Sequence, residues 1–167
     1  YYISPEQAQA KPPTARSDQY ALGVVAFELL AHRLPFEGVT PLEIYLKHVQ
    51  NPVPPLEGLN PLVTPEIEAV VLRALAKNPE ERFASCGEFA RALRVAVAAT
   101  ESQRFASLMA QAQTALDAHD PAAARPLLQQ AALIMPEDKE LRARSEVLET
   151  QERARTTYED AATQLES

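Results

Sequence analysis

Residues 17–32 read SDQYALGVVAFELLAH, and this stretch decides the fold class. It has no helix breaker except Gly23 and is apolar almost all round, and its apolar run VVAFELLA is interrupted by Glu28. A run of this length is too long for a buried strand and is typical of a buried helix. We expect Ser17 or Asp18 to cap its N-terminus, because short polar side chains accept hydrogen bonds from the first helical turn.

The segments on both sides of this run also predict helices. Residues 51–63, NPVPPLEGLNPLV, hold too many prolines for regular structure. Thr40 and Thr64 each precede a proline and an amphipathic run, which is typical of a capped helix start. No stretch alternates convincingly between apolar and polar residues, so we predict an all-α fold. The expected helices cover residues 4–10, 40–50, 64–77, 85–99, 105–120 and 121–135, with one or two charged helices over 137–167.

Composition excludes several classes of protein. Hydrophobic residues make up 46% and charged residues 23% of the chain, which are globular proportions. The net charge of −7 includes no basic stripe, so a nucleic-acid partner is not expected. A single cysteine, Cys86, excludes an intrachain disulfide framework, and His48 and His119 lie too far apart in sequence to suggest a metal site. No apolar run reaches the roughly 18 residues that a membrane span needs.

The composition changes near Thr100. Residues 1–100 carry 9 Lys and Arg against 11 Asp and Glu, whereas residues 101–167 carry 7 against 12 and contain no glycine. We therefore expect a first domain over residues 1–97, a linker over 98–104 and a helical tail over 105–167.

Three motifs carry a resemblance to a known family. They are YYISPEQ at residues 1–7, RSDQYALGVVAFELLAHRLPFEG at 16–38 and ALAKNPEERFAS at 74–85. In this order and at these spacings they resemble the C-terminal lobe of a bacterial-type serine/threonine protein kinase. Ser4–Pro5–Glu6 stands where the family has the Ala-Pro-Glu that closes the activation segment. The resemblance covers roughly residues 1–97 and implies the helical C-terminal lobe of the kinase fold.

The resemblance implies a function for a longer parent protein. Such a kinase transfers the γ-phosphoryl group of Mg-ATP to Ser or Thr of protein substrates. The sequence has no Gly-rich phosphate loop, no His-Arg-Asp and no Asp-Phe-Gly. We therefore expect a fragment that holds no catalytic residue, binds neither ATP nor Mg itself and is inactive alone. We expect a cytoplasmic location, with a possible membrane anchor of the parent beyond this chain. The alternative is a non-catalytic helical module for protein–protein interaction, built on a kinase remnant.

The resemblance assigns structural roles to three charged residues. Glu6 matches the carboxylate that, in the family, pairs with an arginine before the last helix of the lobe, and Arg82 matches that arginine. From spacing alone both would read as exposed residues. Asp18 matches the family's buried aspartate, which accepts hydrogen bonds from the catalytic loop; a plain helix cap is the alternative.

Part of the floor that binds the substrate peptide is also implied by the resemblance. Tyr2 and Ile3 match the wall that receives the substrate residue just after the phosphate acceptor. Glu28 matches a position that meets a substrate arginine in some relatives, but a structural carboxylate inside a buried helix fits it better. His32 stands where family members often have a glycine that ends the central helix in a left-handed turn.

The tail resembles one tetratricopeptide repeat over residues 105–138. Small and large consensus positions are matched by Leu108, Ala112, Ala124, Leu128, Ala131 and Pro136. Partner proteins are expected to bind through residues 105–167. A charged helical linker or a coiled coil is an equally good interpretation.

The resemblance also implies that the helix at 17–31 is covered in the full lobe by helices that precede this chain. Each large side chain left uncovered forfeits roughly 1.5–3 kcal/mol. We therefore expect the isolated chain to be helical but loosely packed and prone to aggregation.

Overall fold

The structure, a computed structural model, describes the backbone of residues 1–56 and 58–165 and, within them, side chains as far as Tyr158. In this part of the chain every regular element is a helix and no strand occurs, which confirms the all-α prediction. None of the described helices combines the length and the apolar character needed to cross a membrane.

The chain divides into two compact units, Tyr1–Thr100 and Glu101–Ser167. The first contains α1 (Pro5–Ala8), α2 (Ala15–Ala31), α3 (Pro41–Gln50), α4 (Pro65–Ala74), a 3₁₀ turn (Pro79–Glu81) and the first part of α5 (Cys86–Asp117). The second contains the rest of α5, α6 (Pro121–Ile134) and α7 (Lys139–Leu165).

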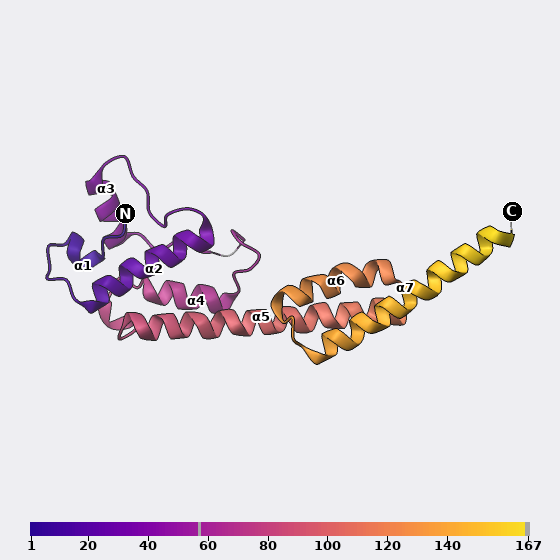
Figure 1. Cartoon of the computed structure of the whole chain (residues 1–167). Helices are drawn as coiled ribbons and strands as arrows, with labels where there is room; N and C mark the ends of the chain where they lie inside the picture. The colour runs from indigo at the N-terminus through magenta and orange to yellow at the C-terminus, as the bar shows by residue number, and fades with distance from the viewer. Residues whose placement is uncertain (57, 166–167) are drawn as a thin grey trace. The chain divides into compact units, whose positions relative to one another are not determined.

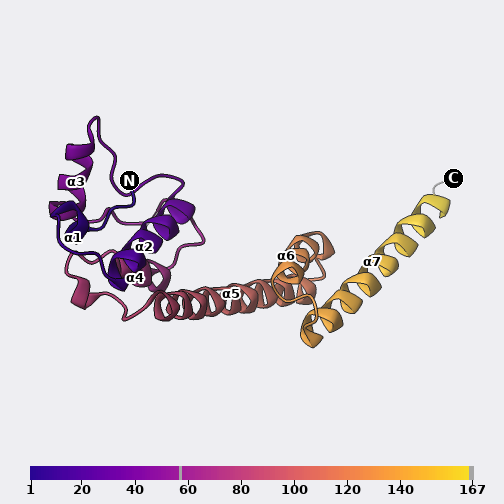
Figure 2. The same cartoon turned by 60° about the vertical axis from the view of Figure 1, so that its left-hand side comes forward.

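The core of the first unit forms around α2, with α4 alongside it (Figures 1 and 2). Tyr20, Val24 and Phe27 of α2 are fully buried. Gly23 permits the close contact between the two helices, since a Cβ at this position would lie 3.1 Å from the Cβ of Ala74. The partners of α2 in this core are Leu56, Val71, Ala74, Leu75, Phe83 and Phe89.

Helix α2 begins two residues before the predicted position. Thr14 is its N-cap, in extended backbone geometry, and the hydroxyl of Ser17 accepts a hydrogen bond from the Thr14 amide at 3.0 Å. The prediction that Ser17 or Asp18 caps the helix was therefore wrong. Thr14 is the first residue after Pro12–Pro13 with a hydroxyl group, so it can cap while Ser17 completes the capping box.

Other helix ends follow the sequence signals. Thr40 caps α3 as predicted, and Ser4 caps α1. Thr64 stands at the N-cap position of α4, but the prediction that it caps this helix was wrong, because its hydroxyl bonds that of Thr100 at 3.1 Å. His32 ends α2 in the left-handed region, with φ of 54°, which is the turn that glycine makes most easily.

Helix α5 runs from Cys86 to Asp117 without a break. Separate helices over 85–99 and 105–120 were expected, so this part of the prediction was wrong. Residues 98–104, expected as a linker, are helical as well. The reason is that no glycine or proline occurs between Gly87 and Pro121, and alanines fill much of the interval.

In the second unit, α6 packs against α7, and both share a core with the C-terminal part of α5. Proline at position 126 lies inside α6, where it removes one backbone donor. The buried residues are Leu108, Met109, Ala112, Leu116, Ala124, Leu128, Ala131, Leu141 and Leu148.

Candidate functional site

A buried ion pair joins α1 to the residue that follows the 3₁₀ turn. Arg82 donates from Nη1 to Glu6 Oε1 and from Nη2 to Glu6 Oε2, each at 2.9 Å. The side chain of Arg82 is fully buried and that of Glu6 is 8% exposed. Two parallel hydrogen bonds between a planar guanidinium and a carboxylate form the strongest common ion-pair geometry. The structure thus brings together Glu6 and Arg82, which lie 76 residues apart.

Arg82 has no unused donor. Its Nε donates to the carbonyl of Ala76 at 2.8 Å, Nη1 also donates to that of Arg16 at 2.8 Å, and Nη2 also donates to that of Lys77 at 3.2 Å. A guanidinium carries five N–H groups, and here five acceptors meet it. Arg82 therefore fastens α1, the start of α2 and the segment after α4 to one another.

The surroundings of the pair keep Glu6 charged. Burial by itself would raise the pKa of Glu6, but hydrogen bonds from Arg82 and Ser17 outweigh it and lower the pKa to about 2. The Ser17 hydroxyl donates to Glu6 Oε1 at 2.7 Å. The ring of Tyr20 lies 4.7 Å from the guanidinium carbon of Arg82, an arrangement that further stabilises the cation.

Asp18 lies apart from this network. It is exposed in the first turn of α2, and its carboxylate has no hydrogen-bond partner within the described residues. A carboxylate in the first turn interacts favourably with the positive end of the helix dipole.

Of the three residues expected to bind substrate, the structure brings two together. The Tyr2 hydroxyl donates to Glu28 Oε2 at 2.7 Å. This hydrogen bond is the main cause that raises the pKa of Tyr2, and desolvation adds to it. Tyr2 is exposed, while Ile3 and Glu28 are half-buried. This hydrogen bond joins the segment before α1 to the last part of α2.

The described residues contain no group of three or more His, Cys, Asp or Glu side chains placed to hold a metal ion.

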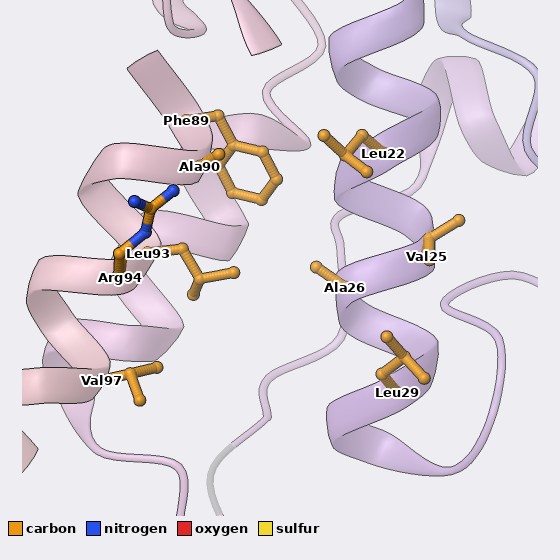
Figure 3. Close-up of a pocket in the computed structure, with 9 residues that line it drawn as sticks. All are labelled: Leu22, Val25, Ala26, Leu29, Phe89, Ala90, Leu93, Arg94 and Val97. Atoms are coloured by element: carbon orange, nitrogen blue, oxygen red, sulfur yellow. The ribbon is translucent and has the colours of Figure 1, made fainter. Parts of the chain in front are cut away.

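An apolar groove of about 410 Å³ lies between α2 and α5, within the first unit. In Figure 3, Phe89 and Leu93 of α5 point toward Ala26 of α2. Leu29, at one end of the groove, is 70% exposed. The remaining lining residues are Leu22, Val25, Ala90, Arg94 and Val97. The apolar face of α2 is thus left open to solvent.

About half of the chain is homologous to bacterial serine/threonine protein kinases. It is 46% identical over 98 residues to a probable serine/threonine-protein kinase of Corynebacterium efficiens and 44% identical over 97 residues to one of Myxococcus xanthus. A third such kinase, from Mycolicibacterium smegmatis, is 48% identical over 88 residues. These matches cover 56%, 58% and 52% of this chain, but only 15%, 14% and 14% of the three relatives. No family model matches the chain.

Several contributors to the ion-pair network were not predicted from the sequence. Ser17 was considered only as a helix cap, although it donates to Glu6. The Tyr20 ring and the Arg16 carbonyl depend on how α2 is placed in the fold, and no local pattern reveals them. A signal for Ser17 did exist, because Thr14 lies three residues before it at capping-box spacing.

Proposed function

We propose that this chain is the C-terminal scaffold of a serine/threonine protein kinase that transfers the γ-phosphoryl group of ATP to Ser or Thr of protein substrates. The observation that carries the proposal is the identity of 42–48% to bacterial kinases over about half of the chain. The chain spans about a seventh of those relatives, and the catalytic groups belong to the rest of the parent protein.

The ion pair of Glu6 and Arg82 supports this assignment. In the proposed kinase it fixes the end of the activation segment to the lobe, which positions Tyr2 and Ile3 for the substrate. Such positioning matters because phosphoryl transfer depends mainly on how the reactants are held. Asp18, exposed in this chain, receives the catalytic loop of the parent kinase.

Tyr2, Ile3 and Glu28 form part of the floor that receives the substrate peptide. Glu28 is committed to the Tyr2 hydroxyl at 2.7 Å, so its first role is to orient Tyr2. A substrate arginine would have to compete with this hydrogen bond for the carboxylate.

Mg and ATP bind to the parent kinase, and the residues of this chain do not fit them. The sequence lacks the phosphate loop and the two acidic motifs, and no cluster of ligands exists among the described residues. The isolated chain is therefore inactive, and the parent kinase works in the cytoplasm on protein substrates.

The open groove between α2 and α5 has a place in this proposal. In the parent kinase, helices that precede this chain cover the exposed side chains of α2. The exposed apolar surface at Leu22, Val25 and Leu29 supports this placement.

Residues 105–138 act as one tetratricopeptide-like repeat that recruits partner proteins. Five of the six consensus positions lie in the core of the second unit: Leu108, Ala112, Ala124, Leu128 and Ala131. Two helices with small residues at their contact, followed by a third, are the pattern such repeats use.

The alternative is a helical binding module without catalysis. The compact second unit, which has its own core, favours it. The coding DNA upstream of Tyr1 distinguishes the two. An open frame that encodes a Gly-rich loop, His-Arg-Asp and Asp-Phe-Gly supports the kinase, whereas a start codon directly before Tyr1 leaves the binding module.

A further inference from the structure

His48 is a buried titratable group that the proposed function does not use. It lies on α3 with 0% of its surface exposed. Its Nδ1 lies 2.9 Å from the Tyr20 hydroxyl, and its Nε2 has no hydrogen-bond partner in the described residues. The neutral ring therefore makes one side-chain hydrogen bond, through Nδ1, while Nε2 stays buried and unpaired.

The ring joins α3 to the rest of the first unit. It makes edge contacts with the rings of Tyr20, at 5.7 Å between centroids, and Phe36, at 4.9 Å. The Lys77 ammonium donates to the backbone carbonyl of His48 at 2.7 Å and lies 4.4 Å from the Phe36 ring centre. Helix α3 also packs against α1, and its Ile44 is buried as well.

The charged groups around His48 are mostly cations. Lys77 faces it from the segment after α4, and Arg82 lies over the ring of Tyr20, while the backbone of Tyr1 acts in the opposite direction and favours the charged ring. The carboxylate of Glu6 on α1 is already occupied by Arg82. A second proton on His48 would therefore create a buried cation with no anionic partner, next to other cations.

We propose that His48 is a pH-sensitive latch, whose protonation releases α3 from α1 and α2 while the rest of the first unit stays folded. A second proton on Nδ1 would take the acceptor away from the Tyr20 hydroxyl and place a buried cation beside the Lys77 ammonium, and the contribution of the Tyr1 backbone offsets only part of this cost. The ring belongs to α3, so the loss of its contact with Tyr20 acts directly on the attachment of α3 to α2.

The pH range follows from the direction of the shift. Burial, with the charge of Lys77 acting the same way, lowers the pKa of His48 to about 4 from an ordinary value of 6.5. A released ring takes up its proton below the ordinary value, so the latch weakens as the pH falls from 6.5 toward 4. The Glu6 pair weakens at lower pH, between 4.5 and about 2, so the two events are separated.

The test is residue-resolved hydrogen exchange of the whole chain at pH 7 and pH 4.5, corrected for the intrinsic pH dependence of exchange. We expect the protection of α3 amides to fall on the order of 50-fold, while α4 amides keep theirs. A pH titration of the His48 ring signal by NMR runs in parallel, with the exposed His32 and His119 in the same spectra as solvent-facing controls.

The variant His48→Asn keeps an acceptor for Tyr20 but cannot titrate. At pH 7 the protection of its α3 amides should be lower than in the wild type, and it should not fall further at pH 4.5. The control His119→Asn should keep the wild-type profile. If His48→Asn does not fold, the wild-type ring titration decides by itself. Equal α3 protection at both pH values, joint loss of α3 and α4, or a His48 ring that titrates near 6.5 in the folded unit would overturn the latch.

Discussion

Arg82 is the residue on which most of the first unit's geometry depends. Its five N–H groups reach two carboxylate oxygens and three backbone carbonyls. The carbonyls belong to Arg16, Ala76 and Lys77, residues at the start of α2 and after α4. Loss of either member of the pair with Glu6 therefore leaves a buried charge and loosens three segments at once.

The variant Glu6→Gln keeps the shape of the side chain and removes its charge. We expect the free energy of unfolding to fall by about 3–5 kcal/mol, because Arg82 remains buried without a counter-charge. Urea unfolding followed by circular dichroism measures this loss. The control is Glu80→Gln, which breaks the exposed pair with Arg16 and should cost less than about 1 kcal/mol. Equal effects of the two variants would contradict a buried, energetically important pair.

The same carboxylate sets an acid limit to stability. The folded-state pKa of Glu6 is about 2, below its ordinary value of 4.5. Its stabilising contribution is therefore complete above pH 4.5 and is lost as the pH falls toward 2, amounting to about 3 kcal/mol. Thermal unfolding midpoints measured from pH 5 to pH 2 should fall in the wild type. In Glu6→Gln, the part of this slope that comes from position 6 should vanish.

At the scale of residues, the sequence predicted some side-chain contacts and did not reveal others. Glu6 and Arg82 could be matched only through the family resemblance, because two residues 76 positions apart share no local pattern. His48 was judged only by its distance from other histidines, and its burial beside Tyr20 was not foreseen. Both depend on how α1, α2 and α3 pack, which helical periodicity does not specify.

The contact between α2 and α4 depends on one glycine. A Cβ on residue 23 would lie 3.1 Å from the Cβ of Ala74 and 3.2 Å from Cδ2 of Leu75. Both neighbours are fully buried, so neither can move freely.

We expect Gly23→Ala to lower the free energy of unfolding by about 1–2 kcal/mol, because overpacking outweighs the better helix propensity of alanine. Gly87→Ala is the matched control, since a Cβ there meets nothing closer than the Ser85 hydroxyl at 3.8 Å. It should be neutral or stabilising in the same denaturant titration. A stabilised Gly23→Ala would show that the two helices are not in close contact.

The left-handed end of α2 gives a prediction with the opposite sign. His32 has φ of 54°, a conformation in which glycine avoids the crowding of a Cβ. His32→Gly should raise the melting temperature, with a gain of about 0.5–1 kcal/mol. His32→Ala keeps the Cβ and serves as control; it should not stabilise the chain. If alanine stabilises as much as glycine, backbone strain at this turn is not the cause.

At the scale of elements, the sequence indicated which segments are helical and mostly where they end. It failed at the start of α2, because the Thr14 capping box was overlooked behind a proline pair. It also failed within α5, where two separate helices were expected and one continuous helix from Cys86 to Asp117 is found. A helix continues through a change of composition unless glycine, proline or a cap stops it.

The molecule as a whole leaves an apolar face of α2 uncovered. Leu29 is 70% exposed and Val25 is 38% exposed, although they lie on the helix that supplies most of the core. This surface accounts for the expectation that the isolated chain is loose and aggregation-prone.

The double variant Val25→Gln, Leu29→Gln should reduce binding of an apolar dye and raise the concentration at which the chain stays monodisperse. Helix content should be unchanged, because these side chains have few contacts to lose. Val24→Gln, on the buried side of the same helix, should instead unfold the first unit. The absence of dye binding by the unmodified chain would contradict an open apolar face.

The central claim, that residues 1–97 are the scaffold of a kinase lobe, has a direct test. In the Myxococcus xanthus kinase, the segment that this chain matches is replaced by residues 1–97, and transfer of phosphate from labelled ATP to a protein acceptor is measured. The account predicts activity well above that of the same kinase with the segment deleted, and its loss when the inserted segment carries Glu6→Gln. A chimera that folds cooperatively yet transfers no more phosphate than the deleted form would contradict it.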